Sequence, residues 1–106
     1  DLIVDMRNIP IIKNYNVPVV LDVTHSNQKP NQSVGKSGGT PEFIETLACS
    51  GVAAGVNGVF LETHPNPKKA LSDGTNMLPL NKLETLLMNS EFLPNVLRVS
   101  PPTISI

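Results

Sequence analysis

The sequence predicts an α/β fold made of parallel strand–helix units, and three observations support this prediction. Short apolar runs at residues 2–4, 18–23 and 58–61 each precede a segment with helix signals, an alternation that predicts βαβ units with right-handed crossovers. The run at 18–23 is continuous rather than alternating in polarity, which is typical of strands covered on both faces of a parallel sheet. Polar residues follow two of the runs, and the carboxyl ends of strands carry the active site in (β/α) barrels. An enzyme is therefore the first hypothesis.

The first unit covers residues 1–14. Leu2–Val4 is a short, mostly β-branched run that predicts a strand. Isoleucines on both sides of Pro10 predict a short helix over residues 8–14, because proline is tolerated only in the first turn of a helix. The chain starts at Asp1, inside or at the beginning of this strand, without an initiator methionine. We therefore expect it to be a piece of a longer protein.

The second unit combines the middle apolar run, a polar loop at residues 26–39 and a helix. Thr40 and Pro41 supply an N-cap and a proline at the first helical position. The helix is expected to run to about Ala54, and Gly55 to end it in the left-handed conformation that glycine adopts at low cost. Apolar residues recur along one side of this helix at helical spacing: Phe43, Ile44, Leu47, Ala48 and Val52.

The third unit begins with a strand at residues 58–61. Asn66 and Pro67 predict a single helical turn over residues 68–71, and Pro79 opens another helix. The apolar stripe of that helix consists of four leucines: Leu80, Leu83, Leu86 and Leu87.

Residues 89–106 break this pattern. Three prolines there prevent a long helix, and the apolar residues between them either pack as extended chain or lack a partner. Three short parallel strands also leave two open edges, which invite pairing with other chains, and three units close no barrel. We therefore expect residues 1–88 to be part of a larger barrel or assembly that does not fold stably alone, followed by a divergent proline-containing tail.

Composition excludes several classes of function. The formal net charge of −1 and the absence of a basic arm argue against binding to nucleic acid or to a membrane surface through bulk charge. Three Phe, one Tyr and no Trp offer few platforms on which single-stranded nucleic acid could stack. Cys49 is the single cysteine and permits no internal disulfide, which fits a reducing compartment. No apolar run approaches the ~20 residues of a membrane helix, so we expect a cytoplasmic protein.

Three residues at or just after predicted strand ends have the chemistry of a divalent metal site: His25, Glu62 and Asp73. One imidazole and two carboxylates suit Zn, Fe, Mn or a similar ion, and no other cofactor is indicated. Their spacing matches no compact metal motif, so the hypothesis depends on their position at strand ends. The competing interpretation makes His25 a turn residue and the two carboxylates solvated or capping groups.

The other reactive side chains suggest structural roles. His64 lies two residues after Glu62 and would share its face in a continuing strand, but a proline follows, so we expect His64 to be structural or to support a metal ligand rather than to bind an ion itself. Cys49 is expected to be a small residue of the buried core. Asp5 and Asp22 end strands, either as orienting carboxylates or as satisfied hydrogen-bond acceptors.

A glycine-rich segment, residues 35–39, leads toward the predicted helix start. Backbone N–H groups in such a segment, together with the helix dipole, predict anion binding; a flexible solvated loop is the alternative. The segment is not a P-loop, because Pro30 occupies the position that requires glycine. Its length and glycine content also suit a lid that closes over substrate.

Several motifs lie in one register over about residues 2–84: LIVDMR at 2–7, DVTHS at 22–26 with Gln28, KSGG at 36–39, ETHP at 62–65 with Pro67, ALSDG at 70–74, and LPL at 78–80 with LE at 83–84. In this order they resemble 3-deoxy-D-manno-octulosonate 8-phosphate synthase, also called 2-dehydro-3-deoxyphosphooctonate aldolase. The resemblance implies the C-terminal three strand–helix units of a (β/α)8 TIM barrel. It also implies a homo-oligomer formed through the barrel part that this chain lacks.

The resemblance further implies a reaction and a pair of substrates. The family condenses phosphoenolpyruvate with arabinose 5-phosphate and water, and it releases 3-deoxy-D-manno-octulosonate 8-phosphate and phosphate. The product is a precursor of a sugar in Gram-negative lipopolysaccharide and plant cell walls. In this chain the activity would belong to a longer parent enzyme.

Residue roles follow from the same resemblance. His25 matches the histidine beside phosphoenolpyruvate that binds the ion in the metal-dependent branch, and Glu62 and Asp73 match the carboxylate ligands of that branch. The fourth ligand is a cysteine that this chain does not contain, since Cys49 does not match it. In the metal-independent branch the same residues would hold water by hydrogen bonds alone. The loop that covers the substrates corresponds here to Gln28, Lys36, Ser37, Gly38 and Gly39.

Two alternatives remain open. The sister synthase that makes 3-deoxy-D-arabino-heptulosonate 7-phosphate has a similar Glu-x-His-Pro and Ser-Asp-Gly pattern, whereas residues 22–28 and 36–39 favour the octulosonate enzyme. A non-catalytic barrel remnant that pairs with other chains or binds phosphate compounds is the second alternative. Most of the family's lysines and arginines for the substrate phosphates lie upstream of Asp1, so we expect no turnover by the chain alone.

Overall fold

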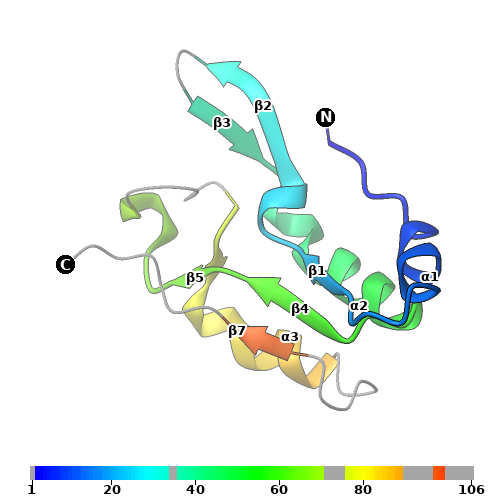
Figure 1. Cartoon of the computed structure of the whole chain (residues 1–106). Helices are drawn as coiled ribbons and strands as arrows, with labels where there is room; N and C mark the ends of the chain where they lie inside the picture. Colours follow the sequence, from blue (N-terminus) through cyan, green and yellow to red (C-terminus); the bar gives the residue numbers. More distant parts are fainter. Residues whose placement is uncertain (1, 34–35, 71–75, 90–96, 100–106) are drawn as a thin grey trace.

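The computed structural model describes residues 2–33, 36–70, 76–89 and 97–99 (Figure 1). Its helices are α1 (Asn8–Lys13), α2 (Ile44–Ala53) and α3 (Leu83–Asn89). Its strands are β1 (Val20–Asp22), β2 (Gln28–Ser33), β3 (Lys36–Gly39), β4 (Gly58–Leu61), β5 (Thr63–His64), β6 (Leu78–Pro79) and β7 (Leu97–Val99). Single 3₁₀ turns cover His25–Asn27, Pro41–Phe43, Pro67–Lys69 and Leu80–Lys82.

A parallel three-stranded sheet in the order β1-β4-β7 organises the described structure. Leu21 of β1 lies opposite Val59 of β4, and Phe60 of β4 lies opposite Arg98 of β7. α2 connects β1 to β4 along the chain, so the three elements form a βαβ unit. The parallel pairing predicted for the second and third apolar runs is confirmed.

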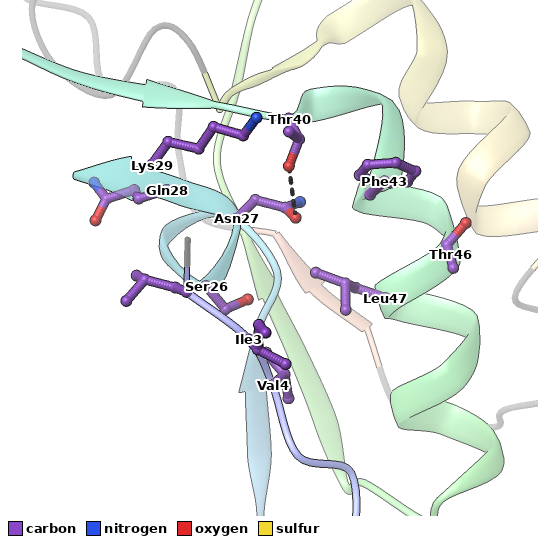
Figure 2. Close-up of a pocket in the computed structure, with 11 residues that line it drawn as sticks. Ile3, Val4, Ser26, Asn27, Gln28, Lys29, Thr40, Phe43, Thr46 and Leu47 are labelled. Carbon is purple, nitrogen blue, oxygen red and sulfur yellow. Dashed lines mark hydrogen bonds between the residues drawn. The ribbon is translucent and has the colours of Figure 1, made fainter. Parts of the chain in front are cut away.

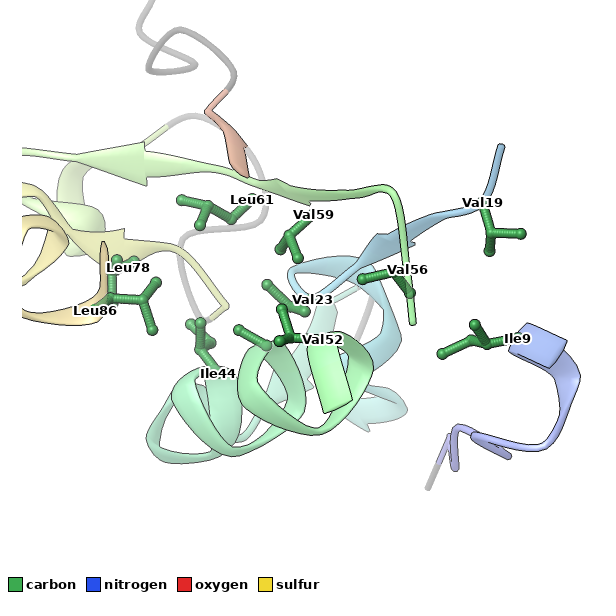
Figure 3. Close-up of a cluster of buried hydrophobic side chains, with 11 residues drawn as sticks. Ile9, Val19, Val23, Ile44, Val52, Val56, Val59, Leu61, Leu78 and Leu86 are labelled. Atoms are coloured by element: carbon green, nitrogen blue, oxygen red, sulfur yellow. The ribbon is translucent and has the colours of Figure 1, made fainter. Parts of the chain in front are cut away.

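The hydrophobic core lies between α2 and one face of this sheet (Figure 3). Val59 and Leu61 of β4 are fully buried and point toward α2, where Ile44 is also buried. Gly51 allows α2 to approach β1 closely, because a Cβ at this position would come within 2.4 Å of Leu21 Cδ2. The core therefore fixes the spacing of α2 from both strands.

The opposite face of the sheet is more open. Val20 belongs to this face, since it alternates with the core-facing Leu21, and 58% of Val20 is exposed. A parallel sheet in a complete (β/α) barrel is covered on both faces. An α/β unit with one covered face and one open face is consistent with part of a barrel.

The prediction of a strand at residues 2–4 is wrong. These residues belong to no strand of the described structure, and Ile3 is 89% exposed. A β-branched run forms a strand only where a neighbouring strand takes its hydrogen bonds, and among the described strands β1 pairs with β4 alone. The helix predicted to follow is confirmed as α1, with Pro10 in its first turn.

The loop predicted over residues 26–39 is also wrong, because most of it forms an antiparallel hairpin. Gln28 of β2 lies opposite Gly39 of β3, and Ser33 lies opposite Lys36, with a register shift between these pairs. The hairpin extends away from the central sheet (Figure 1). The hairpin sequence lacks the alternation of apolar and polar residues that marks a strand with one buried face. The pairing of β2 with β3 therefore could not be predicted from a hydrophobic pattern.

The start of the second helix differs in detail from the prediction. A 3₁₀ turn precedes α2, and Thr40 makes no capping hydrogen bond with its side chain; its Oγ1 donates to Asn27 Oδ1 at 3.4 Å instead. Phe43 is 51% exposed rather than on the buried side, because the tighter 3₁₀ turn changes the angular phase of its residues. The glycine prediction is confirmed, since Gly55 follows the helix with φ 101°.

The remaining elements follow β4. β5 and β6 form a short parallel pair that the sequence did not indicate. The turn at Pro67–Lys69 lies close to the one predicted over residues 68–71. The helix predicted to open at Pro79 is preceded by a 3₁₀ turn at Leu80–Lys82, and α3 begins at Leu83. Of the leucine stripe, Leu86 is buried whereas Leu80 is 42% exposed. Of the two alternatives for the tail, extended chain that packs is confirmed at residues 97–99, which form β7.

None of the helices in the described residues has the length and apolar character needed to cross a membrane.

The two faces of the sheet predict opposite results for two matched substitutions. Val59→Ala removes buried methyl groups that contact α2, so we expect the free energy of unfolding to fall by about 2 kcal/mol. Val20→Ala changes the same side chain on the open face, where surface substitutions change stability by about 0.5 kcal/mol or less. Urea unfolding of the isolated chain followed by circular dichroism measures both, and one cooperative transition would contradict the expectation that the chain does not fold stably alone. Equal losses would show that the open face is packed.

Candidate active site

Polar residues gather where β1 and β4 end. β1 ends at Asp22 and is followed by Val23, Thr24 and His25; β4 ends at Leu61 and is followed by Glu62. Because the two strands are parallel and adjacent, their carboxyl ends lie at the same edge of the sheet (Figure 1). This edge contains the candidate site.

Asp22 organises the turn that carries His25. Its Oδ1 accepts hydrogen bonds from the backbone N–H groups of Thr24 and His25, each at 2.9 Å. Its Oδ2 lies 2.7 Å from His25 Nδ1, and its carbonyl oxygen accepts a hydrogen bond from Ser26 Oγ. A carboxylate only accepts hydrogen bonds, so Nδ1 carries the proton. The orienting role considered for Asp22 therefore matches the geometry, and Nε2 is the nitrogen left to face the site.

Glu62 reaches the same point from β4. Its side chain is largely buried, and its Oε1 lies 3.6 Å from His25 Nε2. The Glu62 N–H donates to Thr24 Oγ1 at 2.7 Å, and the Glu62 carbonyl accepts from the N–H of Leu78 at 3.0 Å. The His25 ring stacks on Phe60, with 6.1 Å between ring centroids. Backbone and side-chain contacts thus hold the imidazole and the carboxylate toward each other.

The structure brings together two of the three predicted metal ligands. Nitrogen and oxygen ligands bind zinc at about 2.0–2.2 Å, so atoms 3.6 Å apart can coordinate one ion. Asp73 lies outside the described residues. Within those residues, no three histidine, cysteine or carboxylate side chains form a metal-binding cluster. The His25–Glu62 pair fits a divalent cation as part of a ligand set.

The predicted substrate loop rises from the same edge. Gln28 directly follows the His25–Asn27 turn, and its pairing with Gly39 closes the base of the β2–β3 hairpin. Gly39 packs against Asn76, and a Cβ on Gly39 would lie 2.0 Å from Asn76 Oδ1. Lys36, Ser37, Gly38 and Gly39 therefore belong to a paired strand rather than an irregular anion-binding loop. Whether the hairpin acts as a lid stays a prediction.

Sequence reasoning missed two buried polar residues, Thr24 and Asn76, both of which are fully buried. Thr24 joins the two strand ends through the N–H of Glu62. The only feature of the sequence that points to Thr24 is its position between two candidate site residues, Asp22 and His25. Asn76 lies against Gly39, a contact between segments far apart in sequence that no local pattern contains.

His64 makes a backbone contact just after Glu62. It is buried, and its Nδ1 accepts a hydrogen bond from the N–H of Asn66 at 2.8 Å. The neighbouring Thr63 Oγ1 donates to the Leu78 carbonyl at 2.7 Å. These bonds hold the β5–β6 pair beside Glu62.

Two other candidates lie away from the site. Asp5 is paired with its neighbour Arg7 on the surface, and hydrogen bonds from the Arg7 side chain and backbone lower the pKa of the Asp5 carboxyl. Cys49 is partly exposed on α2, and its Sγ lies 3.9 Å from the carbonyl oxygen of Asn89. The prediction of a buried core cysteine is wrong, because Cys49 faces the end of α3 rather than the sheet.

A cavity of about 380 Å³ adjoins the site (Figure 2). Ile3 and Val4 line one side and Leu47 the opposite side, while the Asn27–Thr40 hydrogen bond spans its upper part in this view. Neither His25 nor Glu62 lines this cavity. The cavity lies beside the polar strand ends and is separate from the candidate site formed by His25 and Glu62.

A parallel βαβ unit with an oriented imidazole and a carboxylate at its strand ends is consistent with part of a (β/α)-barrel enzyme, whose active site lies at the carboxyl ends of the strands. The chain belongs to the DAHP synthetase I family, whose model matches residues 1–96. This family consists of synthases and aldolases that form carbon–carbon bonds.

The similar proteins agree with this assignment. The chain is 48% identical to the 2-dehydro-3-deoxyphosphooctonate aldolase of Leptothrix cholodnii, over 95% of this chain and 35% of that protein. It is 55% identical to the enzyme of the same name from Methylobacillus flagellatus, over 81% and 31% respectively. The chain thus spans about a third of these relatives. The resemblance predicted from the motifs is confirmed.

A solved structure supports the fold. Phospho-2-dehydro-3-deoxyheptonate aldolase (DAHP synthase) from Thermotoga maritima superimposes with a TM-score of 0.67 at 28% sequence identity. The match covers 84% of this chain and 23% of that one. The described elements therefore correspond to part of a larger relative.

The Asp22 contact predicts a change in the His25 tautomer. Asp22→Ala removes the acceptor at Nδ1, so the Nδ1–H form of neutral His25 should fall from the dominant form to a minority. Nitrogen-15 NMR of the imidazole ring measures the two forms. Asp5→Ala is the matched control, since that carboxylate contacts Arg7 and not His25. An unchanged tautomer in Asp22→Ala would contradict the orienting role.

Proposed function

We propose that this chain forms part of an enzyme that condenses phosphoenolpyruvate with arabinose 5-phosphate and water to 3-deoxy-D-manno-octulosonate 8-phosphate and phosphate. The observation that carries the proposal is the His25–Glu62 pair, with 3.6 Å between Nε2 and Oε1 at the carboxyl ends of adjacent parallel strands. The names of the relatives at 48% and 55% identity indicate the octulosonate reaction.

His25, Glu62 and Asp73 are the residues that would hold a divalent metal such as Zn, Fe or Mn. The ion would activate water and polarise the sugar aldehyde. Asp22 fixes the His25 ring through Nδ1, so that Nε2 faces the carboxylate of Glu62. Thr24 holds the backbone of Glu62 in place. Asp22 and Thr24 would thus orient the two ligand residues without touching substrate.

The β2–β3 hairpin would cover the bound substrates. Gln28 stands at its base next to the His25 turn, and Lys36, Ser37, Gly38 and Gly39 form its returning strand. The Gly39–Asn76 packing ties that base to the segment before β6. A hairpin anchored at its base can move as one unit.

Groups that hold the two substrate phosphates would come from the part of the barrel that this chain does not contain, so the activity belongs to a longer parent enzyme. That barrel part would also form the interface of a homo-oligomer. The heptulosonate synthase is the second candidate, because the matching family model and the solved relative are of that type. A non-catalytic remnant is the third.

A graft distinguishes these functions. The Leptothrix cholodnii relative, with its matching region replaced by this chain, should release phosphate from phosphoenolpyruvate with arabinose 5-phosphate at least tenfold faster than with erythrose 4-phosphate. The reverse preference would favour the heptulosonate enzyme, and no activity with either sugar in a folded graft would favour a remnant. The chain alone is expected to give no turnover with either sugar.

The same graft tests the metal ligands. Glu62→Gln and His25→Ala should each weaken zinc binding by at least about 100-fold, because loss of groups that only support ligands already costs 10–100-fold. Glu42→Gln, which makes the same change on an exposed residue, should leave the affinity unchanged. Competition with a zinc-sensitive dye measures the affinity. Unaltered binding in both site variants would overturn the metal assignment.

A further inference from the structure

Asn76 is a fully buried polar residue that joins two parts of the proposed site. A Cβ on Gly39 would lie 2.0 Å from Asn76 Oδ1, 2.4 Å from its Cγ and 2.6 Å from its Nδ2. Since a side chain at residue 39 would collide with all three atoms of the amide group, only glycine permits this contact. The base of the β2–β3 hairpin therefore lies directly against the Asn76 side chain.

The segment after Asn76 leads to Glu62. Leu78, two residues further along the chain, donates its N–H to the Glu62 carbonyl at 3.0 Å. The carbonyl of Leu78 accepts a hydrogen bond from Thr63 Oγ1 at 2.7 Å. Met77, between Asn76 and Leu78, is fully buried. Because close-packed interiors transmit strain, a displacement of the Asn76 side chain reaches the backbone of Glu62.

The hairpin base also contacts the turn after β1. Gly39 pairs with Gln28, and the residues that flank this pair meet, since Thr40 Oγ1 donates to Asn27 Oδ1 at 3.4 Å (Figure 2). Asn27 Nδ2 in turn donates to the Val23 carbonyl at 3.2 Å. The hairpin base is thus held on one side by the turn that follows β1 and on the other side by the segment that precedes β6.

We propose that Asn76 is a positioning residue that couples the β2–β3 hairpin to Glu62. A shift of the hairpin base changes the space that Gly39 leaves for the Asn76 amide, and so moves the Leu78 N–H that binds the Glu62 carbonyl. The coupling is reciprocal, so a ligand that fixes Glu62 also holds the hairpin base. The inference rests on the proposed function for the roles of the hairpin and of Glu62.

Hydrogen exchange of the graft described above tests the coupling. Gly39→Ala inserts a methyl group against the Asn76 amide, so exchange of the Leu78 N–H should accelerate at least tenfold. The Asn57 amide, which donates to Val19 O at 2.8 Å at the opposite end of the sheet, should stay within about threefold. In an Asn76→Ala background, Gly39→Ala should change Leu78 exchange by no more than about threefold, because the amide atoms that the methyl group meets are gone.

Gly51→Ala is the matched control, because it inserts the same methyl group 2.4 Å from Leu21 Cδ2, between α2 and β1. We expect this control to change the two amides by the same factor, as a general loss of stability does. The coupling would be overturned if Gly39→Ala left Leu78 exchange unchanged or accelerated both amides equally. It would also be overturned if the acceleration at Leu78 persisted in the Asn76→Ala background.

Zinc affinity of the graft gives a second readout, which depends on Glu62. Asn76→Ala should weaken zinc binding about tenfold, since groups that support metal ligands contribute 10–100-fold. Asn81→Ala, the same change on an exposed residue of the Leu80–Lys82 turn, should leave the affinity unchanged. Equal affinities in the two variants and the unsubstituted graft would contradict the positioning role. If the unsubstituted graft binds no zinc, the proposed metal site fails, whereas the exchange of the Leu78 amide still decides the coupling.

Discussion

The parallel pairing of β1 with β4 is the constraint on which the rest of the described structure depends. It places the turn after Asp22 and the first residue after Leu61 at one edge, and Thr24 fixes that arrangement through the N–H of Glu62. The 3.6 Å approach of His25 to Glu62 is a consequence of this register. A shift of one residue would turn the side chains of β4 to the opposite face and separate the pair.

The same pairing explains where the chain is well packed and where it is not. α2 returns from the end of β1 to the start of β4 and buries one face of the sheet, with Gly51 against Leu21. The other face leaves Val20 exposed, and the outer edge of β4 is covered by β7. The site lies next to the open face, so its orienting contacts come from its own turn and from β4.

Signals in the local sequence correctly predicted those helices and strands that nearby residues specify. Pro10 marked α1, Gly55 marked the end of α2, and the apolar runs marked β1 and β4. The errors concern residues whose state depends on strand pairing or helix packing that no local hydrophobic pattern marks. Residues 2–4 have no neighbouring strand among the described ones, and residues 28–33 pair with residues 36–39 without a hydrophobic face. The sequence around Cys49 predicts a core residue, but in the structure its Sγ lies beside the carbonyl oxygen of Asn89 at the end of α3.

The sequence by itself determined the family, the elements α1, β1, α2 and β4, and the residue types of the candidate site, because motifs in register and strand-end positions are properties of order along the chain. Only the tertiary structure decided which of these residues meet. It joined His25 to Glu62, directed Nδ1 of His25 to Asp22, and placed residues 97–99 beside β4. These contacts, apart from the Asp22 turn, link residues more than 30 positions apart, and only the packed sheet fixes such distances.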